Sequence, residues 1–227
     1  MSLKEFAREL NGNRVEGELI RTIFYSILTS FAFLAAVYYF KLKEIDNFIG
    51  KYGFYLFFAA LSYSLILAAV RQVRAYQNFP CMSGMMIGMT MGMISGFVSG
   101  FYIGATNGMF IGSVFGMIIG IGIGTWNGKC CGIMGVMEGI MAGFMGGLMG
   151  AMTALMMFND NLKIAAGIIF FISSVILCGL NYLVFIETRE TERQLKEDHF
   201  MTVALTFILI AITTWLMVYG PRSSLFT

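Results

Sequence analysis

A glycine occupies every fourth position from Gly84 to Gly132 without interruption, and this spacing constrains the fold more than any other feature. Residues four apart lie on the same face of an α-helix, so the spacing predicts helices that each carry a stripe of glycine. Glycine is unfavourable in a water-exposed helix but common where membrane helices bring their backbones close together. The series is Gly84, Gly88, Gly92, Gly96, Gly100, Gly104, Gly108, Gly112, Gly116, Gly120, Gly124, Gly128 and Gly132. It predicts closely packed membrane helices.

The composition of the chain also indicates a membrane protein. Hydrophobic residues make up 58% of the chain, charged residues only 12%, and the mean hydropathy is +0.77. Soluble domains typically carry roughly 25% charged residues. The net charge is only +2 and no long basic tract is present, which argues against nucleic acid as a partner. We therefore expect one membrane domain, residues 1–227, in contact with the lipid bilayer.

Four apolar runs outside the glycine region fit the length of a membrane-spanning helix, roughly 17–25 residues. They cover residues 23–40, 54–70, 164–186 and 201–219, with a charged loop at 187–199 between the last two. The first 20 residues are polar and of mixed charge, unlike a cleavable signal peptide. We expect residues 1–20 to form a cytoplasmic segment and the first apolar run to be a membrane anchor.

The glycine region itself, residues 81–157, is too long to cross the membrane once. As a single helix it would measure about 115 Å, against about 30 Å of hydrocarbon. Asn-Gly is a strong turn dipeptide, and it occurs at Asn107-Gly108 and at Asn127-Gly128. Breaks at these pairs predict three passes over residues 82–102, 109–124 and 131–157. The middle pass is short, so a re-entrant hairpin is the alternative.

The predicted fold is an all-α, polytopic helical bundle of about seven spans. The three glycine segments would form a glycine-zipper core, and the other four helices would form its shell. Seven passes put the termini on opposite sides of a cell or inner membrane. Ten of the 15 Lys and Arg residues then fall on the side of the N-terminus, which favours a cytoplasmic N-terminus.

The glycine stripes have two alternative uses. They can pack helices together within one chain, or they can pack copies or partner subunits together in a membrane complex. The sequence does not separate these uses. In either case, a bulky side chain at Gly96 or Gly143 should force neighbouring helices apart.

Sulfur is concentrated in the same region. Residues 81–157 contain 16 of the 19 methionines. A methionine stripe lies about 160° around its helix from a glycine stripe. The methionine stripe consists of Met137, Met141, Met145 and Met149. The glycine stripe consists of Gly135, Gly139, Gly143 and Gly147. Methionine fills irregular gaps between helices, but thioethers and thiolates also bind Cu(I) and other soft ions.

The predicted topology places the three cysteines of this region at one membrane surface. Glu138 is the only acid between residues 81 and 157, and Met134 and Met141 are its neighbours on the helix. An ionisable group inside a membrane is costly unless it has a partner or an ion. The alternative is a protonated acid bonded to a backbone carbonyl. The candidate ligands of a soft metal ion are Cys81, Met82, Met85, Cys130, Cys131, Met134, Glu138 and Met141.

The leading functional hypothesis is binding or translocation of a soft metal ion such as Cu(I) through this core. The alternatives are a structural or assembly subunit whose glycine faces dock partner helices, and an oligomeric pore. The sequence contains no two-histidine metal motif, nucleophile elbow, Walker loop or dinucleotide fingerprint. We therefore expect no enzymatic activity and no catalytic residue. Cys178, within a predicted span, is expected to be a small buried residue.

Overall fold

The computed structural model describes residues 15–40, 52–76, 79–188 and 199–221. These residues are helical throughout, apart from short connections, and include seven helices long and apolar enough to cross a membrane. The prediction of an all-α protein with seven potential spans is confirmed. Most of the predicted N-terminal segment, 1–20, and of the charged loop, 187–199, lies outside the described residues. The helices are α2 (Val15–Phe40), α3 (Phe54–Ala75), α4 (Cys81–Asn107), α5 (Met109–Gly128), α6 (Gly132–Met156), α7 (Leu162–Glu187) and α8 (His199–Tyr219).

The two predicted breaks in the glycine region differ in outcome. Gly108, with φ 110°, separates α4 from α5 as the sequence predicts. The second break was predicted at Asn127-Gly128, but Gly128 is helical there. The chain instead passes through a short 3-10 helix, η3 (Lys129–Cys131), and turns at Gly132, with φ 68°. Because α5 therefore reaches 20 residues, it is long enough to span, and its predicted end at residue 124 was wrong.

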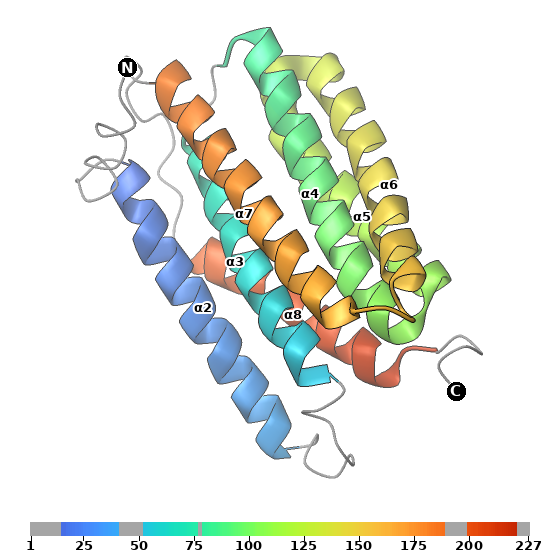
Figure 1. Cartoon of the computed structure of the whole chain (residues 1–227). Coiled ribbons are helices and arrows are strands. Elements are labelled where there is room, and N and C mark those ends of the chain that lie inside the picture. The colour runs from blue at the N-terminus through green and yellow to red at the C-terminus, as the bar shows by residue number, and fades with distance from the viewer. Residues whose placement is uncertain (1–14, 41–51, 77–78, 189–198, 222–227) are drawn as a thin grey trace.

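Helices α4, α5 and α6 stand together as one group on the right of Figure 1. Their backbones approach each other at the glycines. A Cβ atom added to Gly92 of α4 would lie 2.8 Å from the carbonyl oxygen of Gly139 in α6. One added to Gly124 of α5 would lie 2.6 Å from the same oxygen and 2.9 Å from the Cα atom of Gly92. Side chains would not fit at these positions, so the three helices meet directly through their backbones.

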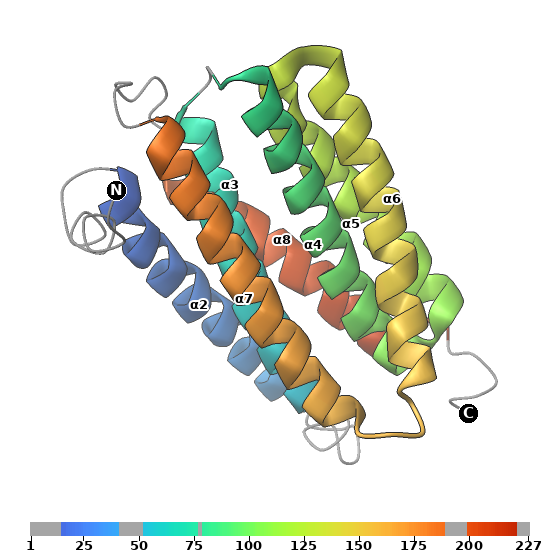
Figure 2. The ribbon, with the colours of Figure 1, turned by 45° about the horizontal axis from the view of Figure 1, so that its top comes forward.

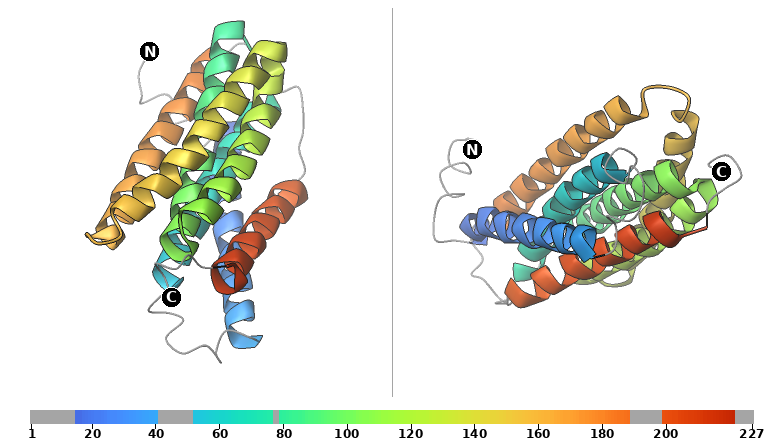
Figure 3. Two further views of the ribbon diagram at one scale, coloured as in Figure 1. Left: turned by 90° about the vertical axis from the view of Figure 1, so that its right-hand side faces the viewer. Right: turned by 90° about the horizontal axis from the view of Figure 1, so that it is seen from below.

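Helix α3 is the central element of the remaining four. Within its most apolar window 72% of the residues are buried, against 17% for α2 and 22% for α7. Seen from below, α3 lies between α7 on one side and α2 and α8 on the other (Figure 3). Helix α8 crosses behind α3 obliquely in both Figure 1 and Figure 2. The glycine-rich group therefore packs against a second layer built around α3.

Candidate functional site

The predicted metal ligands lie near one end of the α4–α5–α6 group. Helices α4 and α6 both begin there, and η3 joins α5 to α6 at the same end (Figure 1). A Cβ atom on Gly88 would lie 2.9 Å from the carbonyl oxygen of Gly135, so α4 and α6 are in contact within about two turns of their N-terminal ends. The structure thus gathers residues that are about 50 positions apart in the sequence. They are Cys81, Met82 and Met85 on α4, Cys130 and Cys131 in η3, and Met134, Glu138 and Met141 on α6.

The side chains at this end differ in accessibility. Cys81 is exposed, and Met82 and Met134 are 79% and 63% exposed. Cys130 is half-buried, and its thiol donates a hydrogen bond to the carbonyl oxygen of Asn127 at 3.1 Å. Glu138 is half-buried as well. The side chain of Cys131 lies outside the described part of the chain. An ion could therefore reach these sulfur atoms from outside the bundle.

The methionine stripe of α6 faces away from the glycine contacts. Its four members are between 53% and 58% exposed, whereas the glycines on the opposite side of the helix are buried. The methionines are Met137, Met141, Met145 and Met149. Because the backbones of α4, α5 and α6 touch each other at the glycines, no thioether of this stripe lies between these helices. The sulfur atoms line the outer surface of the group instead.

The described residues contain no group of three or more His, Cys, Asp and Glu side chains that could hold a metal ion. Thiols and carboxylates alone therefore do not complete a coordination shell in this part of the chain. A soft ion at this end would need thioether ligands in addition, and Met82, Met85, Met134 and Met141 are the methionines available there.

Cys178 of α7 is exposed, and the prediction of a buried residue was wrong. Its neighbours Val175 and Ile176 are 56% and 44% exposed, so this part of α7 presents apolar side chains outwards. A bilayer accepts a small apolar residue on the lipid-facing surface as readily as in the core, and hydropathy alone does not distinguish the two positions.

Polar contacts inside the bundle were not predicted from the sequence. Arg71, which is 4% exposed, donates a hydrogen bond to the Thr22 hydroxyl at 2.9 Å. The guanidinium group of Arg74 lies 4.4 Å from the ring centroid of Trp126, which joins α3 to α5. Ser83 donates to the Glu187 carboxylate at 2.7 Å, which joins α4 to α7. The available signal was the position of polar residues inside apolar runs, which marks buried contacts in membrane proteins.

The comparisons with known proteins add no family to this geometry. The chain matches no protein-family model, no curated protein and no solved structure. The residues described above are therefore the basis for a functional proposal.

Proposed function

We propose that this chain is an integral membrane protein that binds a soft metal ion such as Cu(I) at the shared end of α4, η3 and α6. One observation carries the proposal: the fold brings two sulfur-rich segments together at that end. One contains Cys81, Met82 and Met85, and the other contains Cys130, Met134 and Met141. Thiolate and thioether ligands select soft ions over hard ones. A cytoplasmic location of this end, as the distribution of Lys and Arg favours, would keep the thiols reduced.

Glu138 has a defined role in this proposal. It lies about 9 Å along α6 from Gly132, between Met134 and Met141 on the same side of the helix. A carboxylate within an apolar segment is costly without a nearby positive charge. A bound monovalent cation supplies that charge, and the neighbouring thioethers supply soft ligands. Glu138 would therefore hold the ion at the beginning of the methionine stripe.

Movement of the ion would follow the outer surface of α6, not the centre of the glycine-zipper core. The glycine contacts leave no space for an ion between α4, α5 and α6. The stripe Met137, Met141, Met145 and Met149 offers a thioether at every turn of α6. A second copy of the chain packed against this surface would enclose a path between two such stripes. Translocation thus requires a homo-oligomer, whereas binding at the end of the helices does not.

The test is binding of Ag(I), a redox-stable substitute for Cu(I), to the purified full chain in lipid nanodiscs. Replacing Cys81, Cys130 and Cys131 with serine and Glu138 with glutamine should lower the affinity by about tenfold or more, because thiolates are the strongest ligands of the set. Cys178→Ser is the matched control, since it removes an exposed thiol on α7 that is not among the proposed ligands. Unchanged affinity and stoichiometry in the fourfold variant would contradict the proposal.

The outer surface of α6 also supports a second candidate function, as an assembly subunit of a membrane complex. The glycine faces are occupied within the chain, so a partner helix would dock on the exposed methionine stripe instead. Leucine has similar volume and polarity, so replacing the four methionines of the stripe with leucine should leave assembly unchanged. The same exchange should abolish ion movement if the thioethers act as ligands. Assembly measured by native gel, together with silver uptake into vesicles, separates the two functions.

A further inference from the structure

A small pocket, called the arginine pocket below, lies where the ends of α3 and α5 meet the start of α8. Its cavity volume is about 20 Å³, and its lining comes from these three helices. The polar residues of the lining are Arg71, Arg74, Trp126 and Thr202. A cavity of at least about 10–15 Å³ is needed to hold one water molecule. The arginine pocket therefore admits one group of that size and not a whole small molecule.

Two positive charges line this pocket. Arg71 is 4% exposed and donates a hydrogen bond to the hydroxyl group of Thr22 in α2 at 2.9 Å. Arg74 is half-buried, and its guanidinium carbon lies 4.4 Å from the ring centroid of Trp126. Stacking on a ring uses the flat face of a guanidinium group, so the N–H donors, which lie in its plane, point past the ring. The described residues of the lining include no acidic side chain, so they carry a net positive charge.

Helix α8 adds to the positive potential. Met201 and Thr202, in its first turn, both line the pocket. The N–H groups of a first turn have no acceptor within the helix, and they form the positive end of the helix dipole. Helix N-termini bind phosphate and carboxylate groups for this reason. Two guanidinium groups and a helix N-terminus at one pocket together favour an anion.

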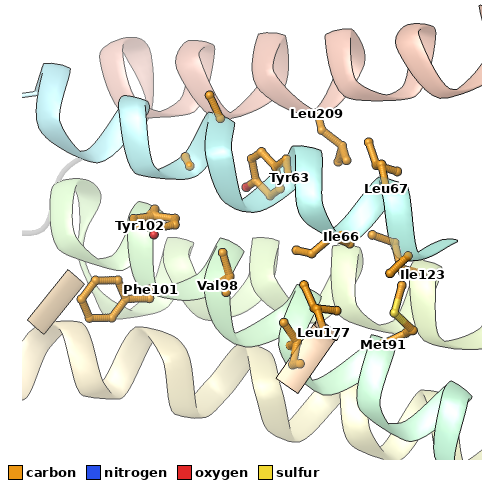
Figure 4. Close-up of a cluster of buried hydrophobic side chains, with 14 of the residues drawn as sticks. Tyr63, Ile66, Leu67, Met91, Val98, Phe101, Tyr102, Ile123, Leu177 and Leu209 are labelled. Atoms are coloured by element: carbon orange, nitrogen blue, oxygen red, sulfur yellow. The ribbon is translucent and has the colours of Figure 1, made fainter. Parts of the chain in front are cut away.

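The inner end of the pocket is apolar, and its outer side is accessible. Leu67 lines the pocket and belongs to the buried cluster of Figure 4, where it lies near Leu209 of α8 and Ile123 of α5. On the outer side, Met201 is 60% exposed and Trp126 is half-buried. Charges interact more strongly beside an apolar wall than in water. An anion would therefore reach the arginines from outside the bundle and be held there by a strengthened attraction.

The position of the pocket selects the kind of anion. Arg71 lies four residues before the end of α3, and Trp126 lies two residues before the end of α5. Tryptophan and arginine side chains at the ends of membrane helices reach the level of the lipid head groups. Basic pockets between membrane helices at this level bind the phosphate groups of anionic lipids. The cavity has room for one phosphate oxygen, and the rest of such a head group would stay among the surrounding lipids.

We propose that the arginine pocket binds the phosphate group of an anionic phospholipid such as phosphatidylglycerol. One phosphate oxygen enters the pocket, where Arg74 and the first turn of α8 donate hydrogen bonds to it and Arg71 adds positive charge. The lipid then connects α3, α5 and α8 at this membrane surface. The proposal does not rest on the soft-metal site, whose ligands belong to α4, η3 and α6.

Quenching of tryptophan fluorescence by brominated lipids tests the proposal on the full chain in nanodiscs. The chain has two tryptophans, so Trp215→Phe leaves Trp126 as the only emitter. Brominated phosphatidylglycerol should quench Trp126 at about fivefold lower mole fraction than brominated phosphatidylcholine, an effect of the size expected for one basic residue near an anionic lipid. Equal quenching by the two lipids would overturn the proposal.

Two variants identify the pocket as the source of the preference. Arg74→Gln should abolish the preference of Trp126 for phosphatidylglycerol, and Arg74→Lys should retain part of it, because lysine keeps the charge but not the planar donors. Lys129→Gln is the matched control, since Lys129 is exposed in η3 at the same end of the bundle and does not line the pocket. Equal losses in Arg74→Gln and Lys129→Gln would indicate a general attraction to the surface and would contradict a specific site. Silver binding should be unchanged in Arg74→Gln, which separates this result from a failure of the soft-metal site.

The same assay distinguishes two other sources of an anion. Inorganic phosphate, compared with chloride at equal ionic strength, should leave the quenching by phosphatidylglycerol unchanged. Displacement of the lipid by phosphate would show that the pocket takes the free ion, against the proposal. The other source is a carboxylate from residues 189–198, a segment with acidic residues that lies outside the described part of the chain. A carboxylate in the pocket would exclude the lipid, and Trp126 would then show no preference in the unmodified pocket.

Discussion

Gly124→Ala is expected to destabilise the bundle by about 3 kcal/mol, the upper part of the range for overpacked positions. The added Cβ atom would lie 2.6 Å from the carbonyl oxygen of Gly139 and 2.9 Å from the Cα atom of Gly92. Both neighbours are backbone atoms in helices, so neither can move aside as a flexible side chain would. Helix α5 would have to separate from α4 and α6 together. Gly124→Leu should prevent folding.

Gly122 provides the matched control for this substitution. It lies two residues before Gly124 on the same helix, but no atom of another helix lies within 4 Å of a Cβ added there. Gly122→Ala should therefore be neutral or stabilising by up to about 1 kcal/mol, because alanine is the better helix former. Thermal unfolding of both variants in the same detergent measures the difference. Equal losses at the two positions would show that the backbone contacts of Gly124 are not responsible.

The difference between Gly122 and Gly124 shows what the sequence could predict. Gly124 belongs to the series of glycines four residues apart, and Gly122 does not. The periodicity therefore identified the helices and the face on which glycine is needed. It also predicted the methionine stripe on the opposite face of α6, which the exposure of Met141 and Met145 bears out.

The parts of the fold that could not be predicted depend on local backbone geometry and on contacts between distant helices. Asn127-Gly128 has the composition of a turn, but Gly132 supplies the positive φ and α5 continues through the dipeptide. A helix ends here where a glycine adopts a positive φ at the level at which the chain reverses direction. Several glycines near Asn127 could adopt that conformation, so the sequence did not show which one does.

The candidate sites show the same limit. The sequence grouped Cys81 with Cys130 because topology places both at one membrane surface, and the helix order was sufficient for that. The meeting of Gln72 with Asn181 joins residues 109 positions apart, and no periodicity links them. Which face of α3 meets α7 is set by packing across the whole bundle, so the contact between Gln72 and Asn181 could be recognised only in three dimensions.

A second substitution with a large expected effect is Asn107→Asp, which replaces the side-chain NH₂ group with an oxygen atom at the C-terminal end of α4. Asn107 is 1% exposed, and its Nδ2 donates to the carbonyl oxygen of Leu216 in α8 at 2.7 Å. Its Oδ1 accepts a hydrogen bond from Thr106 at 2.8 Å, which fixes the amide in this orientation. The bond connects the glycine-rich group to α8. An ionised carboxylate would face the Leu216 carbonyl with an acceptor in place of the donor.

The expected loss of stability at neutral pH is roughly 3 kcal/mol, since the variant buries a charge and replaces an attraction with a repulsion. Asn159→Asp is the control, because Asn159 is exposed in the connection between α6 and α7 and the same change should cost little there. Lowering the pH should restore part of the stability of Asn107→Asp, because a protonated carboxyl group can donate to the Leu216 carbonyl again. The wild-type chain keeps its amide donor at every pH and should show no such recovery. Unfolding of the three proteins at two pH values therefore separates loss of this hydrogen bond from a general effect of added charge, and a variant as stable as wild type at neutral pH would show that α8 is held by other contacts.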